Sequence, residues 1–143
     1  GKFYFLFKGY TSAVDMALKT AVSVGEGSVV DNTIIANVHE DVIKAMSMTT
    51  DVKLEGALGV MEFFSVTAAI YAADSAAKAA DVKLVEIRTG YGIGGKSYVT
   101  MTGSVSAVNA AVSAGINNDN SMGNVVYGTV IPNPDPSLME TLY

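Results

Sequence analysis

The 143-residue sequence contains no cysteine and no tryptophan, and it has one histidine and three prolines. Without cysteine, these residues can form neither a disulfide nor a thiolate metal site. A single histidine cannot build a zinc site without cysteine ligands. Only 16% of the residues are charged, and no run of Lys or Arg offsets the net charge of −5. We therefore do not expect nucleic acid as a partner.

Long apolar runs are also missing. No stretch reaches the roughly 18 apolar residues that a membrane-spanning helix needs, and no signal peptide is recognisable. We therefore expect no membrane partner and a cytoplasmic location. Half of the residues are nevertheless hydrophobic, which is high for a soluble protein of this length and suggests a surface covered by partners.

The most distinctive stretch is the glycine-dense turn 89–96. Four glycines within six residues indicate a sharp bend, positive φ angles or a close approach to another backbone. Gly90, Gly92 and Gly95 match the dinucleotide-binding pattern G-x-G-x-x-G, but such a loop must open a helix. Residues 96–102 instead alternate with period two and are rich in β-formers. The turn is therefore predicted to join two strands, which disfavours a nucleotide site.

Apolar periodicity from residue 57 onward predicts the order β-α-β-β-α-β. The predicted strands are 57–63, 82–88, 96–102 and 125–131. The predicted helices are 65–80, with Ser65 as its cap, and 104–115.

The residues before this segment have a shorter pattern. Strands are predicted at 1–7 and 28–38, with a helix between them that ends at Gly25 and Gly27. A short helical turn is expected at 39–46, and the polar segment after it is the natural linker.

An internal repeat explains this organisation. At an offset of 94, seven of the first fourteen residues are identical to residues 95–108. Such a repeat indicates a duplicated domain. We expect the C-terminal two-thirds of a first domain at 1–46, a linker at 47–56 and a complete second domain at 57–143. About the first 38 residues of the second repeat have no counterpart in the first, so we expect a truncated, cleaved or incompletely recorded form of a tandem protein.

The segments that carry a family resemblance lie in order along the second repeat: 57–62, 72–74, 78–82, 90–95, 103–108 and 130–132. Together they resemble the bacterial microcompartment shell domain. The tandem pairing and the Gly92–Lys96 turn are most similar to the T-type, trimer-forming shell proteins, those of propanediol utilisation in particular. The resemblance implies an α+β fold, with tandem domains whose helices pack on antiparallel-rich sheets.

It also implies a function. Tandem shell proteins of this type form homotrimers that mimic a hexamer, tile into facets with other shell proteins and leave a central pore for metabolites or electrons. Such a protein is structural and not an enzyme. Lys78 matches the edge lysine of the family, whereas Asn133 replaces a frequent arginine at the tile edge. The implied pore-loop residues are Gly90, Tyr91, Gly92, Ile93, Gly94, Gly95, Gly1 and Lys2.

In propanediol-type relatives an iron-sulfur cluster closes the pore, held by a cysteine just ahead of the position of Gly1. These residues themselves imply no cofactor and no metal. A cluster would require a cysteine upstream, because the Ser97 hydroxyl cannot replace a soft thiolate ligand.

Plainer interpretations stay open beside these. The glycine turn can be a simple strand connection, and Asp74 with Lys78 can be an exposed i, i+4 pair. His39 is expected to be solvated or to cap a helix. Glu62 and Glu86 have no evident partner base or nucleophile, so an enzyme is disfavoured.

The alternative function is a tandem small-ligand-binding regulatory domain, because duplicated α+β domains with glycine loops also act as metabolite sensors. A thermal-shift screen with metabolites would distinguish it from a shell subunit, since a bound ligand stabilises the folded state.

Overall fold

The computed structural model describes residues 3–90, 92–138 and 140. The chain divides into two compact units, Gly1–Asn37 and Val38–Tyr143, and each is described by itself. In the described part of the chain, no helix combines the length and the apolar character needed to cross a membrane.

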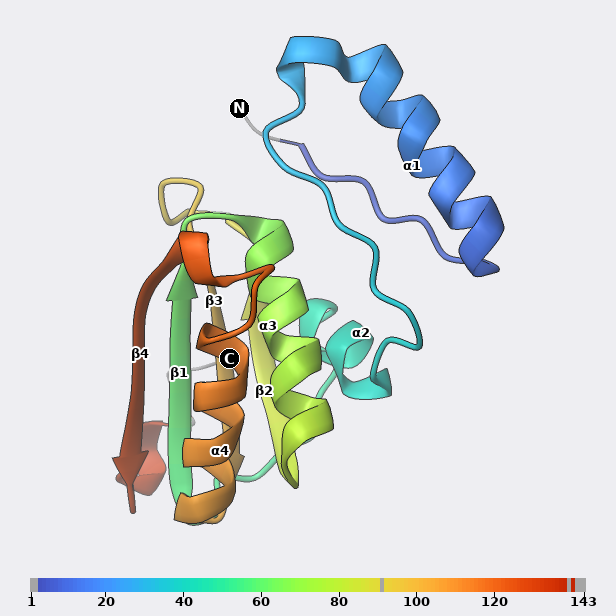
Figure 1. Cartoon of the computed structure of the whole chain (residues 1–143). Coiled ribbons are helices and arrows are strands. Elements are labelled where there is room, and N and C mark those ends of the chain that lie inside the picture. Colours follow the sequence, from blue (N-terminus) through green and yellow to red (C-terminus); the bar gives the residue numbers. More distant parts are fainter. Residues whose placement is uncertain (1–2, 91, 139, 141–143) are drawn as a thin grey trace. The chain divides into compact units, whose positions relative to one another are not determined.

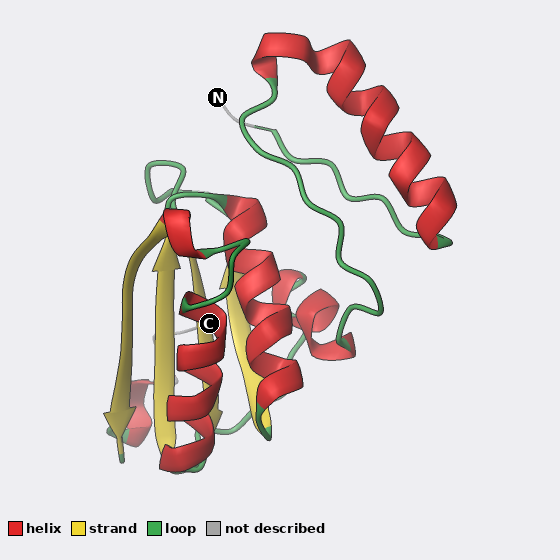
Figure 2. Ribbon diagram, viewed as in Figure 1, coloured by secondary structure: helices red, strands yellow, loops and turns green. Residues whose placement is uncertain are grey.

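The first unit contains one long helix, α1 (Thr11–Gly25), and a short 3-10 turn, η1 (Glu26–Ser28). Helix α1 ends at Gly25, as predicted. Figure 2 shows the remaining described residues of this unit as loops. Every residue of α1 is described, and none is buried.

The strands predicted at 1–7 and 28–38 are absent from the described residues of these ranges, because residues 3–8 and 29–35 lie in irregular structure. Phe3 is 91% exposed. The sequence repeat makes these two segments the counterparts of strands β3 and β4 of the second unit, which both pair with β1 and not with each other. Residues 1–37 contain no counterpart of β1, the strand with which both segments would pair in a sheet.

The second unit is built on a four-stranded sheet of order β2-β3-β1-β4, in which all neighbouring strands are antiparallel. The strands are β1 (Ala57–Phe63), β2 (Val82–Arg88), β3 (Ser97–Gly103) and β4 (Val125–Pro132). Along the chain the order is β1-α3-β2-β3-α4-β4, the order that the sequence pattern predicts.

Helices α3 (Val66–Ala79) and α4 (Val105–Ile116) cover one face of the sheet (Figure 1). Ser65 caps α3, as predicted, because its Oγ accepts a hydrogen bond from the backbone N–H of Ala68 at 3.3 Å. Helix α4 lies directly on β1. A Cβ atom at Gly59 would come within 2.7 Å of a methyl carbon of Val108, so only glycine allows this packing distance.

The interior of the unit lies between this helical layer and the sheet. The largest fully buried side chains include those of Met61, Phe63, Leu84, Ile87 and Met101. Short 3-10 turns precede and follow β4, namely η2 (Met122–Asn124) and η3 (Pro136–Leu138).

Helix α2 (Glu40–Met46) begins at a capping histidine, as expected, because His39 Nδ1 accepts a hydrogen bond from the backbone N–H of Asp41. The following segment is hydrogen-bonded to the sheet, since Thr102 Oγ1 accepts from the backbone N–H of Glu55 at 2.8 Å. The structure therefore groups α2 and residues 47–56 with the second unit. The domain boundary at residue 46 stays a prediction drawn from the sequence repeat.

Candidate functional site

The glycine loop, residues 89–96, connects β2 to β3. Its φ angles are +88° at Gly90, +77° at Gly92, +69° at Gly94 and +81° at Gly95. This left-handed backbone is costly for any residue with a Cβ atom. The loop ends with a hydrogen bond from the backbone N–H of Lys96 to the carbonyl oxygen of Ile93 at 3.3 Å. The backbone conformation therefore favours glycine at all four positions.

The tip of the loop is uncovered. A Cβ atom built at Gly92 or Gly94 would meet no atom within 4 Å, and Figure 1 shows the loop projecting beyond the end of the sheet. Crowding inside the chain therefore does not explain these two glycines. Three predicted loop residues, Tyr91, Gly1 and Lys2, lie outside the described residues.

On the β3 side, the last residue of the loop forms an ion pair. Lys96 Nζ lies 3.1 Å from Glu62 Oε1 on β1 and 5.9 Å from the centre of the Phe64 ring. The Lys96 and Glu62 side chains are 41% and 36% exposed. This pair connects the last residue of the loop to β1, which is the neighbour of β3 in the sheet.

On the β2 side, a buried carboxylate holds two partners. Glu86, only 3% exposed in its side chain, accepts a hydrogen bond from Arg88 Nε at 2.6 Å. Its other oxygen accepts from the Tyr98 hydroxyl at 3.0 Å. The Arg88 guanidinium also lies 5.9 Å from the centre of the Tyr98 ring. The charge of the buried carboxylate is thus paired, as burial requires.

These contacts shift two pKa values. Burial lowers the pKa of Arg88, but attraction to Glu86 and Tyr98 and their hydrogen bonds outweigh it, so the pKa is raised overall. At Tyr98 burial acts in the opposite direction and raises the pKa of the phenol. The hydrogen bond to Glu86 and the negative charge of Glu86 raise this pKa further. Tyr98 therefore stays a neutral donor to Glu86 well into the alkaline range.

Sequence reasoning missed the roles of Glu62 and Glu86, because it looked only for an acid-base pair. Both carboxylates are structural partners of residues that flank the loop. A local signal existed for Glu86, because Arg88 and Tyr98 face each other across the hairpin. For Glu62 none existed, since Lys96 follows it by 34 residues.

The two predicted edge residues lie at the end of the sheet opposite the glycine loop. Lys78 is near the end of α3, just before β2 begins, and Asn133 follows β4. The strand register places the start of β1 beside the end of β4. Asn133 is exposed, has a φ of +45° and donates its backbone N–H to the carbonyl oxygen of Gly56 at 2.7 Å. The structure therefore does not bring the loop and edge residues together.

Asp74 is not the exposed partner that the plain interpretation expected. Its side chain is 7% exposed, and Lys78 Nζ lies 2.5 Å from Oδ2. Its Oδ1 accepts a hydrogen bond from the backbone N–H of His39 at 2.7 Å. One buried carboxylate therefore connects Lys78 of α3 to the start of α2.

Comparison with known proteins identifies this arrangement. A family model for the BMC domain, the bacterial microcompartment domain, matches residues 57–134, a range that includes the glycine loop, Lys78 and Asn133. The chain belongs to the bacterial microcompartment shell protein family. The resemblance noted from the sequence is thereby confirmed.

Two relatives of this BMC protein match most of its length. The bacterial microcompartment shell protein PduT of Citrobacter freundii is 39% identical over 138 residues, which cover 96% of this chain and 75% of the relative. The crystal structure of a microcompartment protein from Desulfitobacterium hafniense has a TM-score of 0.82 and 43% identity, and the match covers 92% of this chain and 73% of that chain. The location of the BMC protein is accordingly a microcompartment shell.

Proposed function

We propose that this BMC shell protein forms a homotrimer in which two tandem domains per chain mimic a hexamer, and that the glycine loop surrounds a central pore for metabolites or electrons. The observation that carries this proposal is the loop itself. Its tip projects from the sheet, and its described residues 92–95 carry no charged side chain. Glycine backbone of this kind suits a crowded symmetry axis, because several copies can approach closely.

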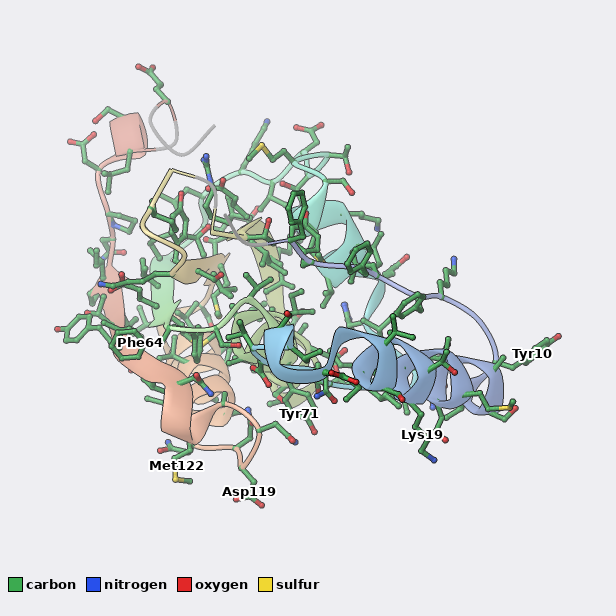
Figure 3. The ribbon with its side chains drawn as sticks, turned by 90° about the horizontal axis from the view of Figure 1, so that it is seen from above. Tyr10, Lys19, Phe64, Tyr71, Asp119 and Met122 are labelled. Carbon is green, nitrogen blue, oxygen red and sulfur yellow. The ribbon has the colours of Figure 1, made fainter. Side chains whose placement is uncertain are left out.

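An apolar surface beside β4 supports the trimer. β4 is an edge strand, and its outer side has no strand partner among the described residues. Four large apolar side chains on and near it are at least 40% exposed: Phe64, Met122, Tyr127 and Ile131. Figure 3 shows Met122 pointing outward at this side of the second unit. An open strand edge with neighbouring apolar side chains favours association, and in this proposal other copies of the chain cover it.

The positions of the edge residues agree with a tile. If the loops converge at the symmetry axis, the residues at the opposite end of the sheet face outward, toward neighbouring tiles. Lys78 and Asn133 lie at that end. In this proposal they contact other shell proteins in the facet, and Asp74 holds the Lys78 ammonium in place.

The proposal includes no catalysis. Among the described residues, the carboxylates nearest to the loop, Glu62 and Glu86, are engaged by Lys96 and Arg88. His39 is engaged as a helix cap. Because the family is structural, a shell subunit replaces the alternative of a ligand-binding regulatory domain.

An iron-sulfur cluster does not fit the residues present. The sequence has no cysteine, and the described residues contain no group of three potential metal ligands. The Ser97 hydroxyl is buried without a hydrogen-bond partner, and it is a hard oxygen ligand. A cluster is therefore proposed only for a chain that supplies a cysteine ahead of Gly1, and iron and sulfide analysis of that chain tests it.

Oligomeric state and lattice formation test the proposed function. Native mass spectrometry of the full chain should show trimers, and electron microscopy should show flat sheets. Tyr127→Glu should disrupt the trimer, whereas Lys78→Ala should keep the trimer and lose the sheets. Lys44→Ala, a control on the exposed side of α2, should do neither. A clean monomer at high protein concentration would overturn the proposal.

A further inference from the structure

The two sequence repeats share a short signature, which in the second repeat lies where the glycine loop meets β3. Residues 1–4 and 95–98 both read Gly-Lys-x-Tyr, although half of the fourteen aligned positions differ. In the second unit the shared lysine and tyrosine are Lys96 and Tyr98. These are the two residues near the start of β3 that contact carboxylates on neighbouring strands.

The contacts lie close together on the sheet. The strand register places Tyr98 opposite Glu62 on β1 and opposite Arg88 on β2. Lys96 is two residues before Tyr98, and side chains two residues apart in a strand share a face. The end of β3 that carries the loop is therefore tied to both of its neighbours, to β1 through Glu62 and to β2 through Glu86.

A glycine-rich loop needs such support, because glycine backbone has more conformational freedom than that of any other residue. The same contacts pair the charges near the loop. Each cation that flanks it, Arg88 or Lys96, has a carboxylate within 3.1 Å. Hydrogen bonds between charged groups are about twice as strong as neutral ones and more directional.

We propose that Lys96, Tyr98, Glu62 and Glu86 form a loop anchor, a set of positioning residues that holds the base of the glycine loop in one conformation. The anchor acts through the backbone and does not itself contact a permeating molecule. This inference rests on the proposed function only for the purpose of the loop, because the anchoring contacts are present in a single chain.

Charge reversal tests the anchor in the full chain. Hydrogen exchange is measured for the backbone amide of Lys96, which is bonded to Ile93. Glu62→Lys and Lys96→Glu should each speed this exchange by roughly two- to fivefold, the range for a partly exposed ion pair. The double variant, with the pair reversed, should return to the wild-type rate. Lys44→Glu is the matched control and should leave the rate unchanged.

A milder variant keeps the test valid if charge reversal prevents folding. Tyr98→Phe removes only the hydroxyl that donates to Glu86, and it should also speed exchange at Lys96. A merely structural role would speed exchange over the whole sheet, including the distant end of β3 at Gly103. Three results would overturn the anchor. The exchange rate at Lys96 could be unchanged in the single variants, or it could rise equally across the whole sheet. In the double variant, the exchange rate at Lys96 could stay above the wild-type rate.

The two proposals can fail separately. If trimers and sheets form but exchange at Lys96 does not respond to charge reversal, the anchor is wrong and the shell function stands. If exchange responds and is restored by the double variant while the chain stays monomeric, the anchor stands and the proposed trimer is wrong.

Discussion

Replacing Asp74 with asparagine should lower the free energy of unfolding of residues 38–143 by about 2 kcal/mol. The carboxylate is buried and accepts from two donors, Lys78 Nζ at 2.5 Å and the backbone N–H of His39 at 2.7 Å. Asparagine has nearly the same size but only one acceptor oxygen. One donor must therefore lose its acceptor, and the remaining bond loses the negative charge.

The magnitude follows from these two contacts. A hydrogen bond to a charged group contributes about 1.5–3 kcal/mol. The Lys78 side chain is 41% exposed, so water recovers part of its lost interaction. The backbone N–H of His39 is part-buried and recovers less. A value near the middle of the range is therefore expected.

Urea unfolding followed by circular dichroism measures this change. Glu40→Gln is the control, because Glu40 also pairs with a lysine four residues later, Lys44, at 3.5 Å, but its side chain is 80% exposed. We expect that variant to cost less than about 0.5 kcal/mol. If Asp74→Asn is as mild as its control, the reasoning from burial is refuted.

Three further predictions concern packing, pH and the loop. Gly59→Ala should destabilise the second unit by about 1–3 kcal/mol in urea unfolding, because the new Cβ would lie 2.7 Å from a methyl carbon of α4. An unchanged urea concentration at the midpoint of unfolding would contradict the tight packing. The pKa of Tyr98 is raised on folding, so its stabilising contribution is complete below its unfolded value of about 10 and is lost as pH rises through the folded value. Wild-type stability should therefore fall more steeply above about pH 10 than that of Tyr98→Phe, and parallel pH profiles would argue against the bond to Glu86. Gly92→Ala should lower the free energy of unfolding by about 1–2 kcal/mol, because its φ of +77° is strained for alanine. Gly123→Ala should lower it less, because Gly123 lies in equally open space but has no positive φ.

Local signals account for what could be predicted in the second unit. Ser65 precedes an apolar stripe with helical spacing, and its hydroxyl satisfies a backbone N–H at the start of that helix. Residues 96–102 alternate like a strand, which showed that the glycine loop joins two strands and does not open a helix. Both signals depend on neighbours within a few residues, so they are present in the sequence without the fold.

The prediction of strands in the first unit was wrong for a physical reason. The apolar run Phe3–Phe7 has the composition of a strand, but a strand exists only when another strand accepts and donates its hydrogen bonds. In the second unit that partner is β1, which lies between β3 and β4. Composition indicates that a segment can be a strand, whereas only the presence of the partner decides that it is one.

By itself the sequence determined the family, the duplicated signature and the position of the glycine loop, because identities and glycine spacing are properties of the chain alone. Tertiary structure alone decided which polar groups far apart in the sequence meet. Glu62 and Lys96 are 34 residues apart, and Asp74 and His39 are 35 apart. Such pairs depend on strand register and helix packing, which are set by the whole fold. Glu62 and Glu86, which have no evident role in the sequence, thus pair with residues at the two ends of the glycine loop.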